Sequence, residues 1–251
     1  MKIYQICFSP TGGTRKAADL LCRAWGALAE PIDLMKHVGP LFFSENDLCL
    51  IAVPVYGGRV PEAALRGLRE MKGNCIPTVL LAVYGNRAVD DALLELRNEA
   101  RAAGFLCIAA VAAVAQHSLL PCFGEGRPDQ KDAKELEGFA KKILDVWEEG
   151  KTSEPEKLPG RWPYQKYGGV PLKPKATSRC MECGLCAREC PVQAIPRDEP
   201  KKPDKKKCIS CMHCVSVCPN EARRVSRLMS RIAVRRLSDA CAERKPNVLY
   251  L

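Results

Sequence analysis

Eight of the fifteen cysteines of this 251-residue chain are gathered between Cys180 and Cys218, at a spacing that can bind iron. They form two runs, CMECGLCARECP and CISCMHCVSVCP, which share the pattern C-x2-C-x2-C-x3-C-P. Three thiolates at this spacing hold one face of an iron–sulfur cubane, and the fourth, before the proline, binds the other cluster. The first cluster is therefore expected at Cys180, Cys183, Cys186 and Cys218, and the second at Cys190, Cys208, Cys211 and Cys214.

Zinc is the alternative for clustered cysteines, but structural zinc sites use four ligands in two separated pairs. The fourth cysteine of each run precedes Pro191 or Pro219, which does not fit that spacing. Residues 176–225 instead resemble bacterial two-cluster ferredoxins, which implies a small α+β domain with two [4Fe–4S] clusters. The chain departs from that family in its polar, lysine-rich interval at residues 197–207.

The lysine-rich interval bears on the partners of the protein. Its cations offset the negative charge of the thiolate-bound clusters and offer a docking face for an acidic redox protein. No aromatic residue interleaves with the lysines, so a stacking surface for single-stranded nucleic acid is absent from this run. The expected partner is thus an acidic redox protein rather than a nucleic acid.

A second candidate site is the turn Ser9-Pro10-Thr11-Gly12-Gly13-Thr14. The two glycines allow a tight turn whose N–H groups face one centre, and the following helix adds the positive end of its dipole. Three hydroxyls can complete a cage for a phosphate. The turn matches neither the Gly-Lys-Ser/Thr phosphate loop of nucleotide triphosphatases nor the G-x-G-x-x-G turn of dinucleotide-binding folds.

The elements that must position this turn alternate along residues 1–150. Apolar runs predict strands at 2–9, 31–35, 47–56, 76–84 and 105–115, and helical spacing predicts helices at 14–28, 61–72, 90–103 and 132–149. Near-continuous apolar strands are typical of a parallel sheet covered on both faces. We therefore expect an α/β domain with a five-stranded, doubly wound parallel sheet.

Ligands of such sheets bind outside the carboxyl ends of the strands, and four loops rich in glycine, aromatic and polar residues follow the predicted strands. The first is the turn at residues 9–14. The others are PVYGGRVP at 54–61, VYGNRAVDD at 83–91 and QHSLLPCFGEGRPD at 116–129. The candidate cofactor-binding residues on the second and third loops are Pro54, Val55, Tyr56, Gly57, Gly58, Tyr84, Gly85, Asn86, Arg87 and Asp90.

The first turn resembles the flavodoxin phosphate loop, of the form Ser/Thr-x-Thr-Gly-x-Thr. That resemblance implies a flavodoxin-like fold and an FMN, with Tyr56 stacked on the flavin, Gly57 and Gly58 near its N5, and residues 84–91 at its pyrimidine end. Alternatives remain for single residues. Tyr56 and Tyr84 could simply cap strand ends, and Arg87 could pair with an aspartate at the next helix start. His117 could be a catalytic acid or, more in keeping with the sequence, a structural residue.

Charge divides the chain near residue 150. Residues 1–150 carry 17 basic and 19 acidic residues (net −2), and residues 151–251 carry 22 and 10 (net +12). We expect a flavodoxin-like FMN-binding domain at 1–150, a linker at 151–176, the ferredoxin domain at 177–225 and a basic amphipathic helical tail at 226–251. The tail helix could lie on the protein or on an anionic membrane. The whole arrangement resembles flavodoxin-like proteins fused to a two-cluster ferredoxin, the EFR1-type ferredoxins.

Two redox modules in one chain are compatible with three functions. The favoured one is electron transfer between the [4Fe–4S] clusters and the FMN, by an oxidoreductase or electron-transfer flavoprotein that serves a protein redox partner or a small-molecule substrate. The second is a non-catalytic carrier that docks a larger redox partner, and the third is a redox sensor. The longest apolar run, 105–115, is shorter than the ~20 residues that cross a bilayer. No signal peptide is present, so a cytoplasmic location is expected.

Overall fold

The computed structural model describes residues 2–26, 28–36, 41, 43–44, 46–150 and 153–251. Its N-terminal part contains five parallel strands in the order β2-β1-β3-β4-β5. This order is the one found in flavodoxin-like doubly wound sheets, and it confirms the predicted fold class. The strands are β1 (Ile3–Cys7), β2 (Ala29–Asp33), β3 (Leu48–Pro54), β4 (Pro77–Tyr84) and β5 (Leu106–Val114).

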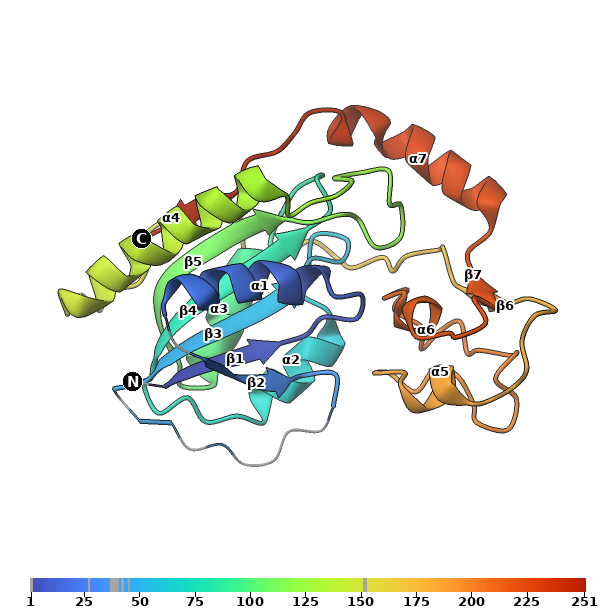
Figure 1. The fold of residues 1–251 in the computed structure, drawn as a ribbon, viewed down its shortest axis with the longest axis horizontal. Coiled ribbons are helices and arrows are strands. Elements are labelled where there is room, and N and C mark those ends of the chain that lie inside the picture. The colour runs from blue at the N-terminus through green and yellow to red at the C-terminus, as the bar shows by residue number, and fades with distance from the viewer. Residues whose placement is uncertain (1, 27, 37–40, 42, 45, 151–152) are drawn as a thin grey trace.

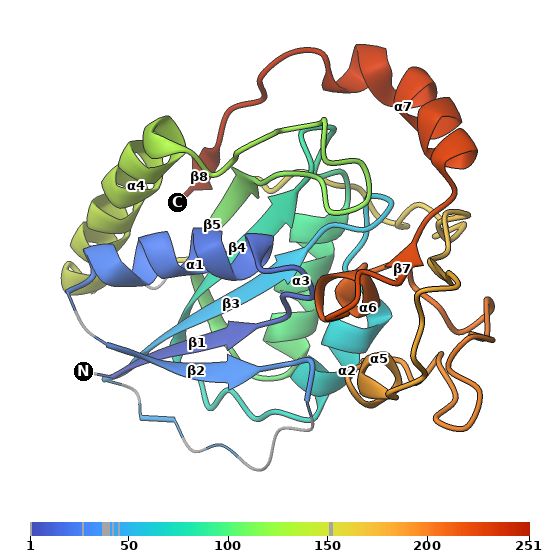
Figure 2. The same cartoon turned by 45° about the vertical axis from the view of Figure 1, so that its right-hand side comes forward.

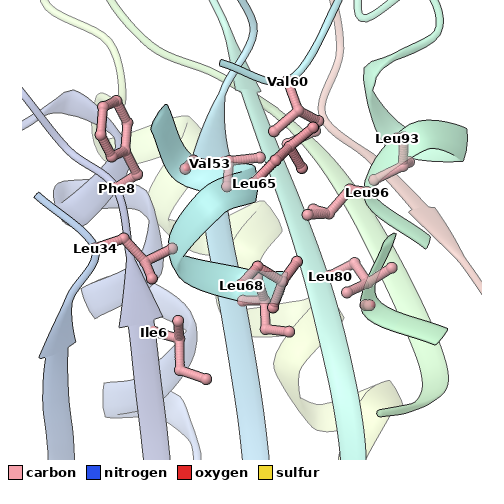
Figure 3. Close-up of a cluster of buried hydrophobic side chains, with 14 of the residues drawn as sticks. Ile6, Phe8, Leu34, Val53, Val60, Leu65, Leu68, Leu80, Leu93 and Leu96 are labelled. Carbon is pink, nitrogen blue, oxygen red and sulfur yellow. The ribbon is translucent and has the colours of Figure 1, made fainter. Parts of the chain in front are cut away.

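Four helices cover the two faces of the sheet (Figure 1). Helices α1 (Gly13–Ala24) and α4 (Gln130–Glu148) pack on one face, and α2 (Glu62–Arg69) and α3 (Ala92–Ala102) pack on the other. The central strands β3 and β4 are buried along their whole length because both of their faces are covered. Figure 3 shows part of the core between the sheet and the α2–α3 layer, with Ile6, Val53 and Leu80 facing Leu68 and Leu96.

Local backbone chemistry moves two helix boundaries from their predicted positions. Helix α1 ends at Ala24 because Gly26 adopts a left-handed φ of 70° and donates its N–H to Arg23 O at 3.1 Å, which closes the helix. Helix α4 begins at Gln130 because the Asp129 carboxylate caps it, in a reciprocal capping box with Asp132. The predicted helix edges at 28 and 132 shift accordingly.

The sheet also has a sixth strand that the sequence did not predict. Strand β8 (Val248–Tyr250) pairs antiparallel with β5, with Val111 opposite Leu249. The segment before it contains the predicted basic helix, α7 (Arg227–Cys241), which begins after the capping residue Ser226. Figures 1 and 2 show this segment running from the cysteine-rich part back across the molecule to the sheet.

The cysteine-rich part is small and internally repeated. A two-stranded sheet, β6 (Lys175–Ala176) and β7 (Arg223–Arg224), accompanies two short helices, α5 (Leu185–Arg188) and α6 (His213–Ser216). Within the described residues, no helix has the length and apolar character needed to cross a membrane.

Candidate functional site

The eight clustered cysteines surround two separate cavities. Each cavity contains four cysteines, in the same two sets that the spacing predicts. Cavity I is lined by Cys180, Cys183, Cys186 and Cys218, and cavity II by Cys190, Cys208, Cys211 and Cys214. Each cavity thus combines three cysteines of one run with the last cysteine of the other run.

The repeat extends to the backbone around the cysteines. Gly184 (φ 74°) and Met212 (φ 63°) are left-handed residues at matching positions before α5 and α6. Matching amides donate to the last cysteine of each run, from Ala194 to Cys190 Sγ at 3.3 Å and from Ala222 to Cys218 Sγ at 3.2 Å. The two runs therefore fold as two copies of one loop.

The donors around the cavities fit iron–sulfur clusters. Burial raises the pKa of the Cys211 thiol to about 12 and that of Cys214 to about 11. Thiols of this kind become thiolates when a metal ion coordinates them. N–H groups directed at the sulfur atoms are the further feature by which proteins stabilise such clusters.

The turn after β1 has the geometry of an anion site. Gly12 has a φ of 86°, and an added Cβ would meet no atom within 4 Å, so conformation rather than space favours glycine there. Thr11 is exposed and Thr14 is buried, and both line the adjoining groove. The side chain of Arg15 turns away from the turn and donates to Gln5 Oε1 at 2.7 Å. The Ser9 hydroxyl accepts the N–H of Arg15 at 2.9 Å, so it caps α1 and does not line the groove.

An open groove runs along the carboxyl edge of the sheet from this turn. Its inner part is open to solvent and is lined by residues from all four loops at this edge of the sheet. A second hollow at Gly12 and Lys16 continues from it, and the two share Thr11 and His117. The predicted residues that line the groove are Thr11, Gly12, Gly13, Thr14, Pro54, Val55, Tyr56, Tyr84 and Gly85. Gln116 and Ser118 also line the groove, and no pattern in the sequence singled them out, although their loop was expected at this edge.

Several other predicted cofactor residues make their contacts away from the groove. Gly57 and Gly58 contact the linker. Gln165 donates to Gly57 O at 3.1 Å, and its side chain fills the space that a Cβ at Gly58 would need. Arg87 pairs with Asp90, which is the alternative that the sequence left open. None of these residues lines the groove, and their role in holding a cofactor stays a prediction.

Asn86 also has contacts outside the groove. Its side-chain amide donates to Cys241 O and Glu243 O, both at 2.9 Å, and its oxygen accepts the N–H of Lys245 at 3.1 Å. The side chain is therefore bonded to the segment between α7 and β8. The sequence carried no signal for this, because the partners lie more than 150 residues away in the chain.

Tyr84 follows the structural alternative. Its hydroxyl donates to Pro246 O at 3.2 Å, so the phenol anchors the same C-terminal segment while the ring lines the groove.

His117 is held in one orientation by two backbone amides. Its Nδ1 accepts the N–H groups of Leu119 at 3.2 Å and Leu120 at 3.3 Å. The ring packs against Gly85, where a Cβ would approach it to 2.6 Å. Burial lowers the pKa of His117, and the nearby Arg87 lowers it further. The imidazole is therefore neutral near pH 7, which favours the structural interpretation over a catalytic acid.

Cavity II lies against the phosphate-loop turn. His213, on α6, is hydrogen-bonded through Nδ1 to Pro10 O at 2.6 Å, and the Ser216 hydroxyl donates to the same oxygen at 3.3 Å. Figure 2 shows α6 beside the loop that precedes α1. Tyr56 lines the groove on the same side, and burial raises the pKa of its phenol, with smaller contributions from Cys211 and Tyr167. The groove and cavity II are thus neighbours.

One sequence family and several solved structures are similar to parts of this chain. Residues 179–222 match the family described as "4Fe-4S dicluster domain". No curated protein sequence matches the chain. Solved structures similar to its N-terminal part include a Streptococcus pneumonia flavodoxin (14% identity, 57% of this chain and 97% of that chain, TM-score 0.40). A Megasphaera elsdenii flavodoxin (18%, 56% and 98%, 0.38) and the rubredoxin oxygen:oxidoreductase of Desulfovibrio gigas (14%, 61% and 37%, 0.42) are also similar. With similarities this low, the fold assignment rests on the strand order.

Proposed function

We propose that this chain, in which a flavodoxin-like domain precedes a 4Fe-4S dicluster domain, transfers electrons between two [4Fe–4S] clusters and an FMN. The observation that carries the proposal is the contact between α6 and the phosphate-loop turn, through His213, Ser216 and Pro10. It brings the cavity II cysteines beside the groove where the flavin would bind. Cavity II would then hold the cluster that exchanges electrons with the FMN, and cavity I would hold the distal one.

The residues of the groove would hold the FMN at its two ends. The hydroxyls of Thr11 and Thr14, with the amides at Gly12 and Gly13, would bind the phosphate. Tyr56 would contact the ring system on the side of cavity II. When bound, FMN supplies the exchange of one or two electrons.

The lysine-rich interval would be the docking face for the electron-donating or electron-accepting protein. Lys201 donates to Glu182, in the first cysteine run, at 2.6 Å, so this interval lies over the cavity I loop. Lys205, Lys206 and Lys207 are exposed. A partner with an acidic face would therefore dock beside the cysteine loops.

Turnover of a small substrate is the less supported form of this function. His117, the histidine that lines the groove, is neutral and accepts two backbone N–H groups. This supports electron transfer by a flavoprotein, acting as an enzyme or as a carrier. It does not support reduction of a substrate that takes its proton from His117.

The test begins with anaerobic reconstitution followed by iron, sulfide and flavin analysis. About eight iron atoms per chain are expected from two cubanes, together with one FMN. The variant Thr11→Val/Thr14→Val should lose FMN and keep its iron, because only the phosphate site changes. Thr177→Val is the matched control, since that hydroxyl is buried without a partner among the described residues and does not line the groove. Zinc in place of iron, or unchanged FMN affinity in the double variant, would refute the proposal.

A further inference from the structure

Arg223, the first residue of β7, lies between the two cysteine cavities and lines both of them. It is only 2% exposed. Its Nη1 donates to Cys186 Sγ at 3.4 Å, at cavity I, and to Pro200 O at 2.8 Å. Cavity II, on its other side, is lined by the four cysteines of the second set. The guanidinium therefore lies beside both sets of cysteines.

Two of the guanidinium nitrogens have no partner. Nε and Nη2 are buried and make no hydrogen bond in the part of the chain that the structure describes. No carboxylate among the described residues pairs with Arg223. Arginine stays protonated at all relevant pH values, and a buried cation with unpaired N–H groups is strongly unfavourable unless an anion compensates it. The cavities on either side are the places where such an anion would lie.

The internal repeat shows that packing alone does not require this arginine. With the offset that relates Cys180 to Cys208, the residue that corresponds to Arg223 is Ile195. Ile195 is buried as well, in an apolar cluster with Cys186 and Ala187. One copy of the loop thus fills this position with an aliphatic side chain, and the other fills it with a cation.

We propose that Arg223 is a redox-tuning residue, whose unpaired N–H groups donate to the sulfur atoms of both clusters and raise both reduction potentials. The inference rests on the proposed function, because it needs two clusters in the two cavities. Each cluster gains one negative charge when it takes up one electron. A fixed cation and N–H···S hydrogen bonds stabilise that reduced form more than the oxidised one. Because one side chain serves both clusters, their potentials rise together, and the difference between the two potentials stays about the same.

The experiment is a redox titration of the reconstituted holoprotein, followed by electron paramagnetic resonance at low temperature. Arg223→Ile, which copies the first repeat, should keep its iron and lower the potential of both clusters. A tenfold or larger change in each reduction equilibrium is expected, which equals ~59 mV for one electron. Arg223→Lys keeps the positive charge but lacks the planar set of guanidinium N–H donors, and it should shift the potentials less than Arg223→Ile does. Arg224→Ile is the matched control, since Arg224 is exposed, and it should titrate as the wild type.

A measurement on the unaltered protein guards against a variant that fails to assemble its clusters. With 15N-labelled arginine, pulsed resonance of the reduced wild-type protein should show nitrogen coupling at both clusters. Wild-type potentials in an iron-replete Arg223→Ile variant would overturn the inference, and so would a shift or a coupling at one cluster only. Those results leave the proposed function standing. Fewer than two clusters in the wild type would overturn both.

Discussion

The segment after α7 is hydrogen-bonded to both members of a buried ion pair in the flavodoxin-like domain, Arg127 and Asp132, and breaking this pair should release the C-terminal strand. Asp132 is fully buried, and it accepts hydrogen bonds from Arg127 Nη2 at 2.6 Å and from Asn247 Nδ2 at 2.9 Å. Arg127 also donates to Lys245 O at 2.8 Å. The two charges therefore connect the start of α4 to the chain that leads into β8.

The variant Asp132→Asn preserves the shape of the side chain and leaves Arg127 as an uncompensated buried cation. Loss of one partner of a buried pair costs about 3–5 kcal/mol. At 1.36 kcal/mol per factor of ten, opening of the β8 segment should become more frequent by roughly two to four orders of magnitude. The variant Asp145→Asn, at an exposed position of the same helix, should change stability by less than about 0.5 kcal/mol.

Hydrogen–deuterium exchange of the anaerobic holoprotein is the suitable assay, because proteins with bound clusters rarely unfold in two states. Peptides that cover 242–251 should exchange faster in Asp132→Asn, while those from β3 and β4 should not.

Lowering the pH should likewise speed the exchange of the 242–251 peptides in the wild type. Burial acts to raise the pKa of Asp132, but Arg127, the Asp129 amide and Asn247 hold it below its usual value. A carboxyl with a lowered pKa stabilises the fold above about pH 4 and loses that contribution as the pH falls. Protection unchanged in Asp132→Asn would refute this account of the tether.

Two further predictions concern the junction between cavity II and the groove. His213→Ala removes a hydrogen bond to Pro10 O, which is worth about 1 kcal/mol, so stopped-flow reduction should show slower cluster-to-flavin transfer with unchanged iron and FMN content. Equal rates would show that this contact does not set the distance between the centres. Tyr56→Ala should weaken FMN binding by about 0.5–1.5 kcal/mol if the ring stacks on the flavin, whereas Tyr56→Phe should bind FMN as the wild type does. The fluorescence of FMN on its release measures the affinity of each variant. Equal affinities in the wild type, Tyr56→Ala and Tyr56→Phe would remove Tyr56 from the site.

Much of the fold could be predicted because the informative patterns are local. Four of the five parallel strands appear in the sequence as near-continuous apolar runs, since both faces of the sheet are covered there. The two cysteine sets follow from a spacing in which each loop wraps its own cluster. The phosphate-loop turn was likewise visible as glycines and hydroxyls between a strand and a helix.

The candidate site was predicted less completely because a residue type does not reveal which neighbour its side chain contacts. Asn86 has the composition of a ligand-binding loop residue, yet its amide is bonded to backbone groups near the C-terminus. Strand β8 has three residues, too few for a periodic pattern, and it forms because β5 offers an unpaired edge.

The sequence by itself determined the redox chemistry of this protein, because ligand spacing and turn composition are properties of short segments. Only the tertiary structure decided which cysteine cavity lies beside the groove, through the contact of His213 with Pro10, 203 residues earlier. It also decided where Arg223 lies, since that position depends on two loops closing around one side chain. Contacts of this kind are set by the packing of distant segments, and no local pattern encodes them.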